Sequence, residues 1–142
     1  MTDPSTALDR FVQAQARDYA QALAELVAGR KRTHWIWYVF PQLRELGRSD
    51  MARHYGLDGI DEAAAYFTHP VLGVRLVECV AAMLRHADRA AADILGEVDA
   101  MKFRSCLTLF ARAAPAEPVF EAALAAFYRG EPDAETLRLL DA

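Results

Sequence analysis

The stretch His34-Trp35-Ile36-Trp37-Tyr38-Val39-Phe40-Pro41-Gln42 decides how this chain folds. Five of its nine residues are His, Trp, Tyr or Phe, and both tryptophans of the chain lie in it. Because the burial of aromatic side chains is a large stabilising term, this segment is expected to organise a hydrophobic core. We call residues 34–42 the aromatic box. The box is too short to cross a membrane as a helix, and its polar ends suggest the wall of a pocket.

The segments on both sides of the aromatic box predict an all-α fold. Alanine-rich stretches with apolar residues at helical spacing alternate with short Gly and Pro punctuation, without sustained alternation of period two. At 142 residues the length predicts one globular domain over residues 1–142. We therefore expect a compact single-domain bundle of about six to eight helices. The expected helices cover roughly residues 6–28, 50–55, 61–67, 70–87, 90–95, 99–113, 118–128 and 134–140.

Composition narrows the classes of protein to which the chain can belong. Hydrophobic residues make up 54% and charged residues 25%, which is typical of a globular protein. The formal net charge of −4 makes a dedicated nucleic-acid-binding protein unlikely as a class, although a local basic patch would be compatible with it. Cys79 and Cys106 show no metal-ligand spacing, and we interpret them as reduced, buried thiols of a cytoplasmic protein.

Motifs for membranes, metals and cofactors are missing from the sequence. The first residues, Met1-Thr2-Asp3-Pro4, lack the pattern of a signal peptide, and no apolar run reaches membrane-spanning length. The four histidines are dispersed without an H-x-x-H pair, and no glycine-rich phosphate loop occurs. We therefore predict no cofactor, no metal site and no membrane partner.

Two polar residues fall within apolar arcs when the helices are placed at about 100° per residue. Gln15 lies among the apolar residues of the first expected helix, where it is either a structural amide bonded to the aromatic box or a pocket-lining group. Lys102 lies in the apolar arc of the helix at 99–113. Its ammonium group must reach water at the helix edge, pair with a carboxylate, or bind the anionic group of a ligand.

Three further features concern the ends and faces of helices. Ser105 follows Lys102 by three residues, a spacing compatible with a Ser–Lys nucleophile, although no third catalytic group is identifiable. His69 precedes a helix start whose free N–H groups favour an anion, unless they are simply capped. Arg75 and Glu78 lie opposite the apolar arc of the helix at 70–87, so we expect them to face solvent and form an ion pair.

The chain as a whole resembles the bacterial family catalogued as domain of unknown function 1810, from about Leu8 to Leu140. The resemblance rests most specifically on the His-Trp…Phe-Pro-Gln pattern of the aromatic box. Weaker matches are Arg10-Phe11, Ala14-Gln15, Gly29-Arg30-Lys31, Leu46-Gly47, Ser49, His69-Pro70, Leu72-Gly73, Arg75-Leu76, Asp99, Lys102, Ser105, Thr108-Leu109-Phe110, Gly130, Asp133 and Thr136-Leu137. The resemblance implies a compact all-α domain and no established activity.

Our leading hypothesis is a pocket for a small anionic ligand, nucleotide-like or phosphorylated, with the aromatic box as its wall. Ligand sites are usually apolar with a few convergent polar groups. The candidate ligand-binding residues are Gln15, Lys31, His34, Trp35, Trp37, Gln42, His69, Lys102 and Ser105. Whether the protein is an enzyme stays open; if chemistry occurs, His34 is the best acid–base candidate because histidine titrates near neutral pH.

Two alternatives belong to other classes of function. The aromatic box could form part of a groove in a non-catalytic protein-interaction module. A weaker alternative is an RNA-binding helical domain that uses Arg30, Lys31, Arg32, Arg44 and Arg48. Convergence of Gln15, His34, Gln42 and Lys102 on one cavity would favour a ligand, whereas mutual pairing in the interior would favour a structural network. The oligomeric state cannot be deduced from the sequence.

Overall fold

The computed structural model describes residues 4–142, and this part of the chain is all-α, which confirms the predicted fold class. It contains nine α-helices, one 3-10 turn (η1) and no β-strand. In chain order the elements are α1 (Pro4–Ala28), α2 (Ile36–Val39), η1 (Arg44–Leu46), α3 (Asp50–His54), α4 (Ile60–Thr68), α5 (Leu72–Leu84), α6 (Ala91–Leu95), α7 (Glu97–Ala113), α8 (Val119–Tyr128) and α9 (Ala134–Leu140).

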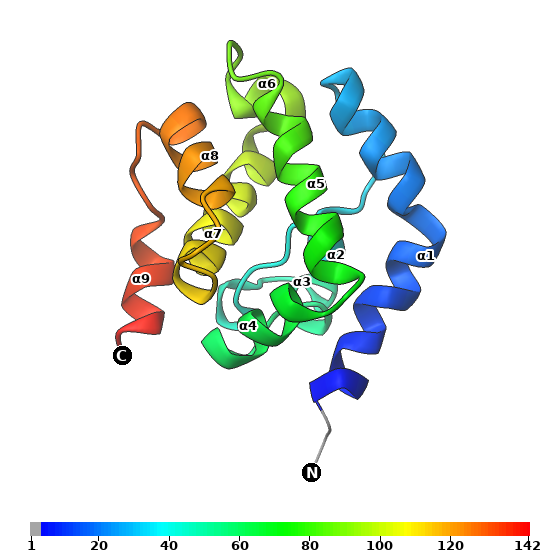
Figure 1. Cartoon of the computed structure of the whole chain (residues 1–142), viewed down its shortest axis with the longest axis vertical. Helices are drawn as coiled ribbons and strands as arrows, with labels where there is room; N and C mark the ends of the chain where they lie inside the picture. The colour runs from blue at the N-terminus through cyan, green and yellow to red at the C-terminus, as the bar shows by residue number, and fades with distance from the viewer. Residues whose placement is uncertain (1–3) are drawn as a thin grey trace.

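Helix α7 lies in the middle of the bundle. It contacts α4, α6, α8 and α9, while α1 lies at the edge of the molecule and packs along α5 (Figure 1). Its residues 105–110 are all buried, because they face neighbouring helices on nearly every side. No helix within residues 4–142 is by itself long and apolar enough to cross a bilayer; α4 and α5 meet that criterion only as a pair, bent by 89°.

The aromatic box lies at the centre of the hydrophobic core. Trp35 and Phe40 are fully buried, with ring centroids 6.1 Å apart. Phe40 in turn lies 4.6 Å from the ring of Phe103 on α7, and Phe103 contacts Phe127 of α8 at 6.2 Å. Aromatic rings therefore connect the box to the C-terminal half of the chain, as expected of a segment that organises the core.

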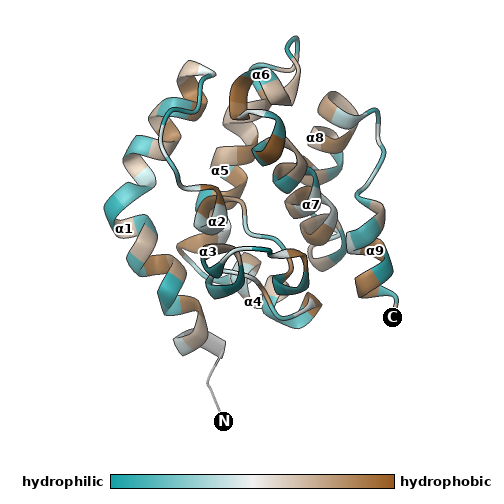
Figure 2. Ribbon diagram, turned by 180° about the vertical axis from the view of Figure 1, so that it is seen from behind, coloured by the Kyte–Doolittle hydropathy of each residue, from teal (hydrophilic) through white to brown (hydrophobic). Residues whose placement is uncertain are grey.

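Two short helical elements, α2 and η1, were not expected. Helix α2 is a single turn inside the aromatic box, and η1 follows Pro41 within the loop that leads to α3. Segments of three or four residues are too short to show helical periodicity, so packing rather than local pattern decides their conformation. Seen from the opposite side, α2 and α3 lie across the front of the bundle, while hydrophilic residues follow the outer side of α1 (Figure 2).

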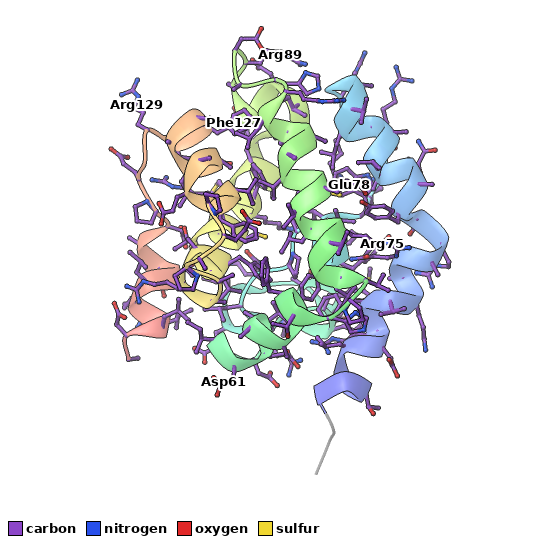
Figure 3. The ribbon with its side chains drawn as sticks, in the orientation of Figure 1. Asp61, Arg75, Glu78, Arg89, Phe127 and Arg129 are labelled. Atoms are coloured by element: carbon purple, nitrogen blue, oxygen red, sulfur yellow. The ribbon has the colours of Figure 1, made fainter. Side chains whose placement is uncertain are left out.

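The polar edge of α5 contacts Tyr19 of α1; Glu78 is exposed there, as expected, whereas Arg75 is half-buried. The Tyr19 hydroxyl donates a hydrogen bond to Glu78, and the Arg75 guanidinium lies 4.5 Å from the centre of the Tyr19 ring. Figure 3 shows both labelled side chains between α5 and α1. No ion pair joins Arg75 to Glu78 in the described part of the chain. The amphipathic pattern could not show that a ring from the neighbouring helix would partly cover Arg75.

Candidate functional site

An open groove of about 450 Å³ contains several of the predicted site residues. It lies where the loop before α3, the N-terminal half of α7 and the start of α9 meet. Its volume is in the range of small-molecule sites. The lining residues are Gln42, Leu46, Arg48, Ser49, Ala52, Val98, Met101, Lys102, Ser105, Asp133 and Glu135.

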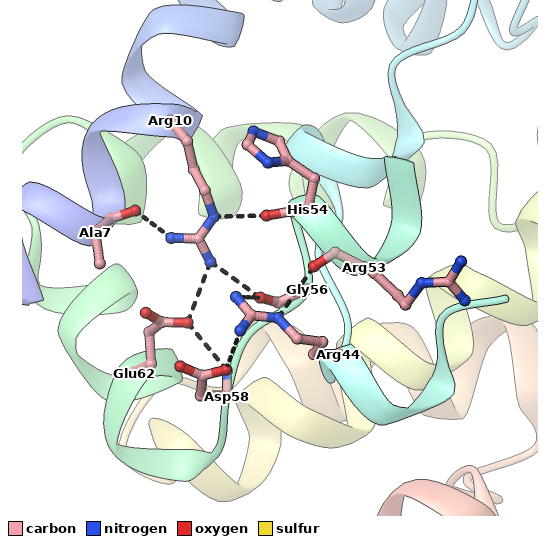
Figure 4. A network of polar contacts seen from close by, with 8 residues as sticks. All are labelled: Ala7, Arg10, Arg44, Arg53, His54, Gly56, Asp58 and Glu62. Carbon is pink, nitrogen blue, oxygen red and sulfur yellow. Dashed lines mark hydrogen bonds and ion pairs between the residues drawn. The ribbon is translucent and has the colours of Figure 1, made fainter. Parts of the chain in front are cut away.

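One wall of the groove is residues 42–52, and the turn that follows this wall is held by Arg10 of α1. Arg10 donates hydrogen bonds of 2.9 Å each to the carbonyl oxygens of His54 and Gly56, and forms an ion pair of 3.2 Å with Glu62 (Figure 4). Arg44 donates to the same Gly56 carbonyl at 3.1 Å. These bonds satisfy backbone acceptors that no helix uses, so they fix the loop around α3 against α1 and α4.

The facing wall is one side of α7. Val98, Met101, Lys102 and Ser105 follow one another at helical spacing, so their side chains share a face. Val98 is 66% exposed and Met101 is 71% exposed. Large apolar side chains that are this exposed beside a concave surface are typical of binding sites.

Lys102 brings positive charge to the groove that its nearest carboxylate does not balance. Its Nζ is 4.0 Å from Oδ1 of Asp99, the outer limit of an ion pair. The other oxygen of Asp99 lies 3.0 Å from Nζ of Lys31, whose side chain is only 7% exposed. Because Asp99 already neutralises Lys31, one net positive charge remains at Lys102. The ammonium group also lies 5.7 Å from the centre of the Trp37 ring.

The other charges around the groove roughly cancel, so the groove keeps the positive charge of Lys102. Arg48 lines the groove and forms no ion pair with any residue that the structure describes. Asp133 uses Oδ2 to accept hydrogen bonds from the backbone N–H and hydroxyl of Thr136, and thereby caps the N-terminus of α9. Glu135 is paired with Arg138. Asp133 keeps its negative charge, because its hydrogen-bond donors are neutral, so the cations Arg48 and Lys102 together exceed it by one charge.

Three of the predicted ligand-binding residues, Gln42, Lys102 and Ser105, line the groove together. Trp37 lies beside it, in the wall of a smaller cavity that also includes Gln42 and Lys102. The apolar part of the groove is aliphatic rather than aromatic, since Trp35 and Tyr38 are buried in the core.

The structure places Gln15 and Trp35 in the interior, away from the groove. The Gln15 amide donates to the carbonyl oxygen of Tyr38 at 2.7 Å and to the hydroxyl of Tyr66 at 3.1 Å. Trp35 donates from Nε1 to Glu25 at 3.0 Å. Both side chains therefore connect the aromatic box to its neighbours, as the structural interpretation of Gln15 expects.

The remaining candidates, Lys31, His34 and His69, also lie outside the groove. Lys31 is paired with Asp99, and His34 is an exposed residue that contributes its carbonyl oxygen to a hydrogen bond from Tyr38. The imidazole Nδ1 of His69 accepts hydrogen bonds from the backbone N–H groups that follow it, at residues 71 and 72. These are the N–H groups considered above for an anion, and the histidine itself caps them.

The buried carboxylate of Glu25 holds the loop that leads from α1 to the aromatic box. The sequence did not single out this residue. Glu25 accepts hydrogen bonds from the backbone N–H groups of Arg32 and Thr33, the Thr33 hydroxyl, the Gln21 amide and the Trp35 indole. Burial by itself raises the pKa of Glu25, but these hydrogen bonds outweigh it and hold the pKa well below its ordinary value. The signal in the sequence was the position of Glu25 three residues after Ala22, because this spacing places both residues on the same face of α1.

The groove offers binding groups but no activated nucleophile among the described residues. The Ser105 hydroxyl donates to the carbonyl oxygen of Met101 at 3.2 Å and has no hydrogen bond to Lys102. Burial raises the pKa of Cys79 to about 12 and that of Cys106 well above its ordinary value. No group of three or more His, Cys, Asp or Glu side chains within residues 4–142 could hold a metal ion.

Comparison with known proteins bears on both fold and family. The model of a family described as protein of unknown function (DUF1810) matches residues 5–140. The crystal structure of the conserved hypothetical protein Rv1873 from Mycobacterium tuberculosis at 1.38 Å is similar, with a TM-score of 0.93 and 47% sequence identity. That match covers 95% of this chain and 96% of the other. No curated protein matches the chain.

Proposed function

The chain belongs to the DUF1810 family, and from the geometry of its groove we propose that it binds a small anionic ligand, nucleotide-like or phosphorylated, that carries an apolar body. The observation that carries this proposal is the uncompensated positive charge of Lys102 beside exposed apolar side chains of the same helix face. An anion would restore the charge balance that Asp99 leaves incomplete.

The apolar body of the ligand would lie against Val98, Met101 and Leu46. Covering these side chains removes apolar surface from water, which supplies affinity. Arg48 on the facing wall would contribute a second cationic contact. The proposal is one of binding; Ser105 would hydrogen-bond the ligand rather than attack it, because no base is placed beside its hydroxyl.

Thermal-shift measurements with phenyl phosphate, phenol and inorganic phosphate test this proposal. Phenyl phosphate should raise the melting temperature more than either part alone, because a ligand that binds only the folded state stabilises it. Lys102→Met should abolish the shift but leave the melting temperature of the free protein nearly unchanged, since the stem keeps its packing. Arg85→Met removes an exposed cation at the C-cap of α5, outside the groove, and is the matched control.

Three results would contradict the proposal. If phenyl phosphate and phenol gave the same shift, or if Lys102→Met and Arg85→Met responded alike, the charge of Lys102 would have no part in binding. A destabilised Lys102→Met protein with an unchanged ligand response would indicate that Lys102 serves the fold through Asp99 and Trp37.

A protein segment with an apolar face is the second candidate, because Val98 and Met101 are so strongly exposed. Binding of that kind would depend on these two side chains and be insensitive to Lys102→Met. The RNA-binding alternative has less support, since Lys31 is paired with Asp99 and Arg44 with Asp58 at 2.6 Å.

A further inference from the structure

A second, much smaller cavity adjoins the groove on the side of the aromatic box. It measures about 10 Å³ and shares Gln42, Ala52 and Lys102 with the groove. A space of this size is close to the minimum for a single water molecule. Its other lining residues are Ile36, Trp37, Phe40, Tyr55 and Gly56.

The indole N–H of Trp37 has no hydrogen-bond partner among the described residues, although the atom is buried. It is the one buried side-chain nitrogen or oxygen within them for which this holds. Because indole can only donate a hydrogen bond, it requires an acceptor that residues 4–142 do not supply. Buried donors without an acceptor are rare and often mark a site for water or a ligand.

Two more donors with free capacity line the same small cavity. The side-chain amide of Gln42 forms no hydrogen bond within the described chain; only its backbone carbonyl does, with the N–H of Leu57 at 2.9 Å. The Lys102 ammonium has Asp99 at 4.0 Å, beyond hydrogen-bond length. Three side chains from α2, the loop after it and α7 therefore bring donors with free capacity to the lining of one cavity.

We propose that this cavity is an inner subsite that receives one oxygen of the ligand's oxyanion. The inference rests on the proposed function and locates the anionic group within it. A phosphate or carboxylate oxygen can accept several hydrogen bonds at once, so it would accept from Trp37 Nε1, the Gln42 amide and Lys102 Nζ. Only a single oxygen fits the space, so the rest of the oxyanion would lie in the groove, with the apolar body towards Val98 and Met101.

The indole signals of the two tryptophans in a ¹H–¹⁵N correlation spectrum provide the test. Trp37→Phe assigns them by removing one signal. On titration of the wild-type protein with phenyl phosphate, the Trp37 signal should move while the Trp35 signal stays, since Trp35 already donates to Glu25. Parallel titrations with phenylacetate and phenol distinguish phosphate from carboxylate and exclude an effect of the ring, since phenol carries no oxyanion.

Affinity measurements on variants complete the test. Trp37→Phe keeps an aromatic ring and removes the donor, and should weaken phenyl phosphate binding about tenfold, the loss typical of one hydrogen bond to a charged group. Gln42→Leu should also weaken it, whereas Gln13→Leu on the exposed side of α1 should not.

The outcomes separate the subsite from the groove. If the backbone signals of Met101 and Ser105 move on titration but the Trp37 indole does not, the inner subsite is wrong and the groove still binds. If neither moves with any probe, the proposed function itself fails. A Trp37 indole signal that moves equally with phenol would also reject an oxyanion site.

Discussion

Glu25 shows how one side chain can determine the path of a loop. Residues 29–35 leave α1 and must deliver Trp35 to the core, and the backbone N–H groups there have no helix to satisfy them. The Glu25 carboxylate accepts from two of these N–H groups at 2.7 and 3.0 Å, and from the Trp35 indole. A single buried charge thus replaces the missing partners of two backbone N–H groups.

We expect Glu25→Gln to destabilise the protein by about 2–3 kcal/mol, because an amide offers one acceptor and turns two new hydrogens towards existing donors. The free energy of unfolding from urea denaturation measures the effect. Glu121→Gln on the exposed side of α8 is the control and should change stability little. Equal effects of the two substitutions would contradict the role of Glu25.

The same residue predicts a dependence of stability on pH. Since the pKa of Glu25 is lower in the folded protein than in the unfolded chain, its stabilising contribution is present above its ordinary pKa and is lost as the pH falls below it. Between about pH 6 and about pH 3 the wild-type protein should lose more stability than Glu25→Gln does. If the stability of both proteins fell equally over this pH range, the pKa of Glu25 would be the same in the folded and unfolded states, and the prediction would be wrong.

At the scale of elements, the sharp corner between α4 and α5 depends on a glycine. The two helices are bent by 89° over a short break. A Cβ atom at Gly73 would lie 1.8 Å from the carbonyl oxygen of Phe67, which is backbone and cannot rotate away. The close approach of the two helices therefore requires the absence of a side chain at this position.

Gly73→Ala should consequently destabilise the fold by about 3 kcal/mol or more, because the corner must open to relieve the overlap. Gly59→Ala is the matched control: a Cβ there meets no atom within 4 Å, and φ of 177° is extended backbone that alanine adopts freely. The melting temperatures of both variants measure the effect. A Gly73→Ala protein as stable as Gly59→Ala would show that the corner between α4 and α5 does not require a glycine.

At the scale of the molecule, one contiguous hydrophobic core connects the helices within residues 4–142. Buried residues from α1, α2 and α4 through α8 belong to a single cluster, and the aromatic contacts pass from the box to α7 and α8. Helices that share one core lose their packing together, because none of them can retain its buried face alone.

Unfolding in urea should therefore be a single cooperative transition. Far-UV circular dichroism reports all helices, whereas tryptophan fluorescence reports the aromatic box, and the two curves should have the same midpoint. A box that loses its fluorescence signal at a lower urea concentration than the helices would indicate that residues 34–42 open independently of the bundle.

The sequence by itself determined the all-α class and the approximate limits of the long helices. Helical periodicity, glycine stops and caps such as Asp133 are local signals, carried by residues within one or two turns of each other. The same local pattern singled out Gln15 and Lys102 as polar residues on apolar faces, and it drew attention to the aromatic box that the core is built around.

Only the tertiary structure decided which of these polar residues share a cavity. Gln15 and Lys102 look alike on a helical wheel, yet one bonds the carbonyl of Tyr38 in the interior and the other faces the groove. The ion pair of Lys31 with Asp99 joins residues far apart in the chain, as does the meeting of Trp37 with Lys102. Such contacts leave no periodic trace in the sequence, because they arise from the packing of α2 and α7 rather than from either segment alone.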